Sequence, residues 1–509
     1  MKSLFKTVSL IIFFSIVTRI IGFLFKVFVS RTIGAEALGE YQVSFSLFMV
    51  LLTVISSGLP FVISRLTASY RAKHDIINER KTVTAGIVIS FFVSIIICLL
   101  VVIFIPILKH IFADERCITT LLLLLPALIF SSVYCAIRAN FWGRNKYFAL
   151  CITELIEEVS RVVLFVILIN GSMASKDGAS LLAISMSIAC VISAIIVVLI
   201  YFLKGGKLKK NEDLKIYKEL LKKSTPITGV RIAASLVQPI IALIVPLRLV
   251  AVGYTSSQAL SLFGIAMGMT LPFLFIPSTI TGSLSTALVP DLSSAVAKDN
   301  KEYIKERVIS AIKFTIFIST LFIPLYLGAG TFIGEFFYNN TQSGVMLEYS
   351  AWVLLPLGLT GISSSLLNSL GYELKSMRNY ILGAVLLLLS IWFLPSIMGI
   401  NALIWAFGVC FTITSILNLN MIRKILDCSL NIAKHLITEI LLVIPSASIC
   451  SLLCNLLANY IPLFFSLAIS CTMGVVCFVL LCLVFNVVNI EPYASKLKIK
   501  ILKKSKKSS

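Results

Sequence analysis

The chain has 509 residues, of which 58% are hydrophobic and 13% are charged, and its mean hydropathy is +1.01. Soluble domains carry about 25% charged residues, so this composition excludes an ordinary water-soluble protein. The net charge of +21 would suit a nucleic-acid-binding protein, but the basic residues lie in short segments between long apolar runs and are not gathered in one basic domain. We therefore expect an integral membrane protein that has the lipid bilayer, and no nucleic acid, as its partner.

A helix needs about 20 apolar residues to cross a bilayer, and the chain contains about 14 such runs. The prediction is an all-α integral membrane protein with about 14 transmembrane helices. In chain order, the predicted spans are 8–30, 41–66, 83–105, 118–138, 147–170, 179–203, 226–252, 258–289, 308–330, 347–370, 378–399, 400–422, 436–458 and 461–488.

One local pattern recurs six spans apart. Leu59 and Pro60 near the end of the second span precede a polar segment, and Val289 and Pro290 near the end of the eighth span precede a similar one. Such parallel repeats are typical of transporters built from two related halves. We predict two pseudo-symmetric six-helix lobes, a linker, an extra helix pair and a tail. The predicted boundaries are 1–203 for the first lobe, 204–225 for the basic cytoplasmic linker, 226–430 for the second lobe, 431–490 for the extra helix pair and 491–509 for the basic cytoplasmic tail.

The distribution of positive charge predicts the orientation. With the N-terminus in the cytoplasm, the cytoplasmic segments hold 33 of the 44 Lys and Arg residues, and the outer loops hold Arg31, Lys109, Arg116 and Lys176. Cytoplasmic loops of membrane proteins carry an excess of Lys and Arg. We therefore predict a multi-pass protein of the cytoplasmic membrane with both termini in the cytoplasm, and we expect a monomer.

Two arginines lie where charge is costly. Arg19 is at the middle of the first span, and Arg231 enters the seventh span at the corresponding place of the second half. A charged side chain at the bilayer centre costs about 2.5–3.5 kcal/mol, so both are candidates for binding a substrate in a cavity. A guanidinium suits phosphate or carboxylate. The alternative is a structural ion pair between helices.

The fifth span carries four charged residues in the sequence TELIEEVSR: Glu154, Glu157, Glu158 and Arg161. Their spacing places them on one helical face, which we expect to line the interior. Glu157 and Arg161 are four residues apart and are expected to pair, whereas Glu154 has Arg19 or Arg231 as an expected partner. These acids are also the candidate site for a coupling ion, H⁺ or Na⁺. A purely structural network is the alternative.

Glycine and proline interrupt several spans. Proline inside a helix removes a hydrogen bond and produces a kink, and broken helices line the moving parts of many transporters. Simple curvature is the alternative. The candidate hinge or gating residues are Gly58, Pro60, Pro239, Pro246, Pro272 and Pro277.

The motifs of several enzyme classes are missing from the sequence. It contains no nucleotide-binding loop, no HExxH and no CxxC, and its three histidines fall in predicted loops. We predict no metal, no cofactor and no catalytic residue, and therefore no enzyme.

The chain resembles the stage V sporulation protein B family, a polysaccharide-transporter branch of the multidrug/oligosaccharidyl-lipid/polysaccharide exporter superfamily that is related to the lipid II flippases. The resemblance lies in three stretches, which are 18–66 (TRIIGFLFKVFVSRTIGAEALGEYQ and onward), 154–163 (ELIEEVSRVV, counted from Glu154) and 222–297 (KKSTPITGVRI and onward). It implies fourteen helices, two lobes around a central cavity, and alternating access.

The resemblance also implies roles for particular residues. Arg19 matches the arginine of the flippases' first helix and would contact the substrate's pyrophosphate, and Glu157 and Arg161 match the family's Glu–Arg pair. The flippases' arginine of the eighth helix has no counterpart in FGIAMGMTLPFLF, residues 263–275. Drug antiporters of the superfamily use an acid in the first or seventh helix, and neither predicted span has one.

Three functions follow as hypotheses. The first is a flippase of an undecaprenyl-pyrophosphate-linked saccharide, a peptidoglycan or polysaccharide precursor, that serves cell-envelope or spore-cortex synthesis. The second is an ion-coupled multidrug exporter, whose cavity should be acidic. The third is a non-transporting membrane scaffold for envelope assembly, which would act through 204–223 and the tail.

Overall fold

The computed structural model describes residues 2–171, 177–209, 214–298, 300–427, 432–485 and 487. Within these ranges the secondary structure is entirely helical. A helix satisfies its backbone hydrogen bonds internally, as a bilayer requires. The prediction of an all-α membrane fold is therefore confirmed.

The number of spans follows from the lengths of the helices. Twelve continuous helical segments of the described chain are long and apolar enough to cross a membrane. One of them, Phe13–Ala72, has 60 residues, which corresponds to about 90 Å and exceeds one crossing. It contains two predicted spans, divided where Gly34 adopts a φ of 78°. Helix α6 (Tyr147–Asn170) carries four charged residues and is a further predicted span outside the twelve. The second crossing within Phe13–Ala72 and helix α6 bring the twelve segments to fourteen, which is the predicted number of spans.

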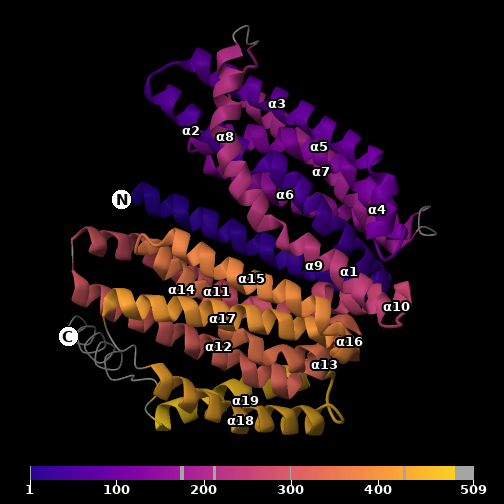
Figure 1. The fold of residues 1–509 in the computed structure, drawn as a ribbon, viewed down its shortest axis with the longest axis vertical. Helices are drawn as coiled ribbons and strands as arrows, with labels where there is room; N and C mark the ends of the chain where they lie inside the picture. The colour runs from indigo at the N-terminus through magenta and orange to yellow at the C-terminus, as the bar shows by residue number, and fades with distance from the viewer. Residues whose placement is uncertain are drawn as a thin grey trace, which may run out of the picture. The chain divides into compact units, whose positions relative to one another are not determined.

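The helices group into two compact units. The first comprises Met1–Met269 and Ile391–Ile400. Helix α5 is its centre and packs against α1, α2, α3 and α7; Figure 1 shows α3, α5 and α7 side by side. The helices of this unit are α1 (Lys2–Ser56), α2 (Gly58–Ala72), α3 (Ile76–Ile103), α4 (Ile105–Ile111), α5 (Arg116–Gly143), α6, α7 (Gly178–Leu203), α8 (Leu214–Ser235), α9 (Val237–Ala251), α10 (Ser256–Phe263) and the short α16 (Pro395–Met398).

Two breaks in the first unit have the same cause. Helix α1 ends at Ser56, four residues before Pro60, and α8 ends at Ser235, four residues before Pro239. Proline has no N–H to donate to the carbonyl four residues earlier, and its ring clashes with that carbonyl. The chain therefore begins a new helix, α2 or α9, after one intervening residue in each case.

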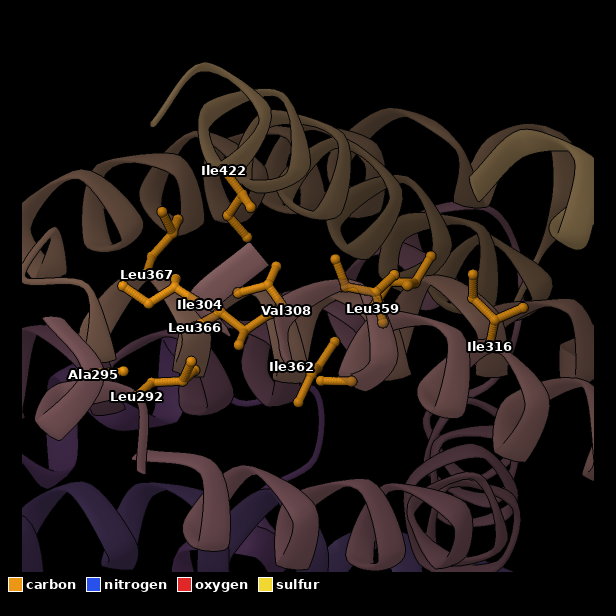
Figure 2. Packing of buried hydrophobic residues seen from close by; sticks show 12 residues of the cluster. Leu292, Ala295, Ile304, Val308, Ile316, Leu359, Ile362, Leu366, Leu367 and Ile422 are labelled. Carbon is orange, nitrogen blue, oxygen red and sulfur yellow. The ribbon is translucent and has the colours of Figure 1, made fainter. Parts of the chain in front are cut away.

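The second unit comprises Thr270–Ser390 and Asn401–Ser509. Its core lies among α11, α12, α14 and α17, where Leu292, Val308, Ile362 and Ile422 are buried against one another (Figure 2). The helices here are α11 (Leu271–Ala297), α12 (Lys301–Tyr338), α13 (Thr341–Ser350), η2 (Ala351–Val353), α14 (Leu354–Ser369), most of α15 (Glu373–Phe393), α17 (Asn401–Leu426), α18 (Ile432–Leu457) and α19 (Leu463–Val484), preceded by the π-helix η1 (Gly264–Thr270).

Two helices at the C-terminal end of the described chain form a pair. Helices α18 and α19 pack against each other and against α12, and Figure 1 shows them as neighbours in yellow. They fall inside the range 431–490, predicted to be an extra helix pair. The boundaries predicted for lobes and linker stay predictions, and the predicted tail, 491–509, lies outside the described residues.

Candidate functional site: a charged face in the first unit

The charged face of α6 lies against α1 and α7. Arg161 forms an ion pair with Glu158, and both side chains are mostly buried. The guanidinium lies 5.6 Å from the ring centre of Phe25 in α1 and donates to Met186 Sδ in α7 at 3.6 Å. The expected partner was Glu157. Glu157 and Glu158 both lie on the face of α6 that carries Arg161, so spacing alone allows either pair. In the structure Arg161 pairs with Glu158 and also contacts Phe25 of α1 and Met186 of α7.

Glu158 is held directly against the backbone of α1. A Cβ added to Gly22 would lie 3.0 Å from Glu158 Oε1, so a small residue is required there for this approach. Lys26, one turn further along α1, interacts electrostatically with both Glu158 and Arg161. The sequence analysis did not select Lys26, although its spacing of seven residues from Arg19 places both on one helical face.

Glu154 pairs with Arg138, the last residue of the predicted span 118–138, which the sequence analysis did not select as a site residue. Arg138 belongs to α5 and donates to Glu154 Oε2 at 2.8 Å, with its guanidinium 5.0 Å from the ring centre of Tyr134. The expected partners Arg19 and Arg231 do not form this contact. Because α5 packs beside α6, Arg138 reaches Glu154 from a neighbouring helix, which sequence spacing does not reveal.

Glu157 completes the charged face. It interacts electrostatically with Tyr134, Arg138 and Arg161, and so lies between the two ion pairs. The three acids of α6 are therefore matched in formal charge by Lys26, Arg138 and Arg161. We call these six residues the α6 charge network.

Arg19 and Arg231 do not belong to the α6 charge network. Both are exposed, and neither has a carboxylate within 4.0 Å among the described residues. An unpaired guanidinium is tolerated in a span only where water, headgroups or a charged ligand can reach it. These two arginines therefore stay predicted anion-binding residues.

Gly58, one of the predicted hinge residues, lies at a close contact between two helices of the first unit. A Cβ added to Gly58 would overlap the carbonyl oxygen of Ser224 in α8, so α2 and α8 approach closely. A cavity of about 270 Å³ lies beside this contact, and another of about 310 Å³ lies between α1, α9 and α10. The first is lined in part by Ile232 and the second by Ser235 and Gln238, so both cavities lie near the break between α8 and α9.

The remaining candidate prolines lie within helices, where each lacks an N–H for a backbone hydrogen bond. Pro246 is inside α9. Pro272 is in the first turn of α11, which continues directly from the π-helix η1, and Pro277 lies further along α11. In the described chain, no group of three or more His, Cys, Asp or Glu residues is arranged to hold a metal ion.

Comparisons with known proteins identify the fold and the family. The family described as "Polysaccharide biosynthesis protein" matches residues 4–296. The chain is 24% identical over 458 residues to "Stage V sporulation protein B" of Bacillus subtilis (strain 168), covering 87% of this chain and 88% of that protein. It shares 24% identity over 379 residues with "Uncharacterized membrane protein YabM" of the same organism, covering 70% and 68%.

Solved structures show the same fold. The structure titled "Lipid II flippase MurJ, inward closed conformation" matches with a TM-score of 0.67 and 15% identity, covering 94% of this chain and 98% of that one. An inward-facing multidrug resistance MATE family transporter of the MOP superfamily matches with a TM-score of 0.66 and 14% identity, covering 81% and 94%. The predicted resemblance is confirmed, as is the prediction of a multi-pass membrane protein that is not an enzyme.

Proposed function

Since the chain belongs to the polysaccharide biosynthesis protein family, we propose that it is a flippase of an undecaprenyl-pyrophosphate-linked saccharide. It would move a peptidoglycan or polysaccharide precursor across the cytoplasmic membrane by alternating access, for cell-envelope or spore-cortex synthesis. The similarity in fold to a lipid II flippase supports this substrate class, and the distribution of Lys and Arg supports placing both termini in the cytoplasm.

The observation that carries the proposal is the exposed Arg19. It lies in the apolar segment Phe13–Ala72, has no acidic partner among the described residues, and precedes Lys26 by seven residues on the same helical face. A pyrophosphate is the type of group that a guanidinium binds with two parallel hydrogen bonds. The saccharide head would bind at Arg19 while the polyprenyl chain stays in the lipid.

The α6 charge network has a supporting part in this proposal. Its acids are neutralised by Lys26, Arg138 and Arg161, so they do not cancel the charge of Arg19. Glu154, Glu157 and Glu158 stay the proposed site for a coupling ion, H⁺ or Na⁺. Gly58, Pro60, Pro239, Pro246, Pro272 and Pro277 stay the proposed hinge residues, and the proposed working form is a monomer.

A flipping assay tests the role of Arg19. Proteoliposomes would contain the full chain and a fluorescent undecaprenyl-pyrophosphate-linked saccharide, and the label exposed in the opposite leaflet would be measured. A charge-assisted hydrogen bond contributes about 1.5–3 kcal/mol, so Arg19→Ala should lower apparent affinity about 10- to 100-fold. Arg19→Lys should retain part of the activity. Lys109→Ala, which removes an exposed charge of α4 that pairs with Glu115, should leave activity unchanged.

Other outcomes would favour the other two functions. Efflux of a cationic drug without lipid movement would identify a multidrug exporter, for which the acids of α6 are the candidate sites. No transport of either kind, together with a phenotype lost only when 491–509 is removed, would indicate a scaffold. Unchanged flipping by Arg19→Ala would contradict the assignment of the pyrophosphate site.

A further inference from the structure

An acid outside the α6 charge network is buried in the first unit. Glu40 lies in α1 after the Gly34 break, and only 1% of its surface is exposed. The hydroxyl of Thr120 in α5 donates a hydrogen bond to Glu40 Oε1. The second carboxyl oxygen, Oε2, is buried without a hydrogen-bond partner. An ionised oxygen in that position would be strongly unfavourable.

A second acid faces Glu40. Asp177, the residue before α7, has its carboxyl within hydrogen-bonding reach of the Glu40 carboxyl. Asp at this position usually accepts from the first turn of its own helix, but the Asp177 side chain makes no such bond. The start of α7 is held against α1, because a Cβ at Gly178 would overlap the side chain of Ile33. The packing of α7 on α1 therefore keeps the two acids together.

The positive charge that acts on Glu40 in the described chain does not neutralise this pair. Arg116 acts electrostatically on Glu40, but its guanidinium already donates to Glu36 at 2.6 Å and to Asp114 at 2.9 Å. The thiol of Cys117 also lies near Glu40 and is fully buried. Among the described residues that act on Glu40, none adds a positive charge that is not already paired.

We propose that Glu40 and Asp177 share one proton and form a proton-binding site of the first unit. Two carboxylates are both acceptors and cannot bond to each other, whereas a single proton between them supplies a donor and removes the repulsion. A hard metal cation would need several more oxygen ligands. Asp177 is exposed and connects the pair with solvent, so the proton can leave by that route. Its loss would repel the start of α7 from α1.

Infrared spectroscopy of the purified full-length protein tests the shared proton directly. At neutral pH, the wild-type protein should show a carboxylic acid C=O band that both Glu40→Gln and Asp177→Asn reduce by about one group per molecule. Glu115→Gln is the matched control, because Glu115 is exposed and pairs with Lys109. An unchanged band in both variants would overturn the proposal. If Glu40→Gln does not fold, Asp177→Asn, at an exposed position, carries the test alone.

The pH dependence of stability gives a second readout. A native state that retains a proton the unfolded chain has lost becomes less stable as the pH rises. The wild-type protein should therefore unfold at a lower temperature in alkaline buffer than in neutral buffer, and Glu40→Gln should show a smaller decrease than Glu115→Gln. Stabilisation by NaCl over choline chloride that disappears in Glu40→Gln would show a bound sodium ion instead and would refute the shared proton.

Discussion

In the first unit, Glu79 in the first turn of α3 accepts a hydrogen bond from Arg144, which directly follows α5, at 2.5 Å, and both side chains are buried. In the second unit, Asn418 accepts from the amide of Asn379 at 2.9 Å and donates to Ser363 at 3.2 Å. Both networks join helices, the first through charges and the second through neutral amide and hydroxyl groups. Removing one partner of a buried ion pair leaves an uncompensated buried charge and strongly destabilises the fold. Removing one partner of a neutral hydrogen-bond network costs less stability.

This difference indicates where charged chemistry is concentrated. The first unit contains the α6 charge network, Arg19 and the Glu40–Asp177 pair, all on helices that pack around α5. In the described part of the second unit, Glu439 is a buried acid, and it accepts from Thr320 at 2.6 Å. The first unit is therefore the place to expect both binding of an anionic head group and responses to pH.

The largest effect on stability is expected at the buried ion pair of the first unit. Arg144→Ala leaves Glu79 with one positively charged partner, the half-exposed Arg71 at 3.7 Å. The substitution should lower the free energy of unfolding by about 3–5 kcal/mol. Thermal and denaturant unfolding in nanodiscs would measure the change. Arg71→Ala, which removes the weaker partner, should lower it by less than about 1 kcal/mol. Equal effects of the two substitutions would contradict the view that the buried Arg144 stabilises Glu79 more than the half-exposed Arg71 does.

A smaller effect is expected at the neutral network of the second unit. Asn418→Ala leaves Asn379 and Ser363 without their partner and should lower the free energy of unfolding by about 1–3 kcal/mol. The same unfolding measurements apply, with Asn455→Ala as control, because Asn455 is exposed on α18. A loss as large as that of Arg144→Ala would show that the two units do not differ in this way.

The smallest effects are expected at two corresponding helix starts. Asp75 caps α3 and Asn300 caps α12, each by accepting a backbone N–H three residues later. Hydrogen bonds from Asn78 hold the pKa of Asp75 below its ordinary value. The contribution of Asp75 to the free energy of unfolding is therefore fully present above its unfolded pKa of about 4. It is lost as the pH falls through the lower pKa of the folded state.

Unfolding temperatures at several pH values would compare these two caps. The difference between wild type and Asp75→Ala should shrink as the pH is lowered below about 4, while that between wild type and Asn300→Ala should stay constant. A constant difference for both variants would indicate that the charge of Asp75 has no part in the cap.

Much of the fold could be predicted from residue patterns. The run lengths predict the spans, and the spacing of Glu154 and Arg161 correctly places them on one face of α6. The pairing of those charges was less predictable. Arg161 pairs with Glu158, and Glu154 pairs with Arg138, because α1, α5 and α7 supply neighbours that lie far away in the sequence. Glu40 was not selected at all, since a lone acid beside a predicted span gives no sequence signal of burial.

The sequence by itself determined that this protein is helical and membrane-embedded. A bilayer offers no hydrogen-bond partners to the backbone, so every long apolar run has to form a helix, and prolines such as Pro60 and Pro239 determine where helices end. Only the tertiary structure decided which charges meet. Glu40 and Thr120 are 80 residues apart, and their contact depends on how α1 packs on α5. Spacing within one helix cannot specify such a contact, because the partner belongs to another helix.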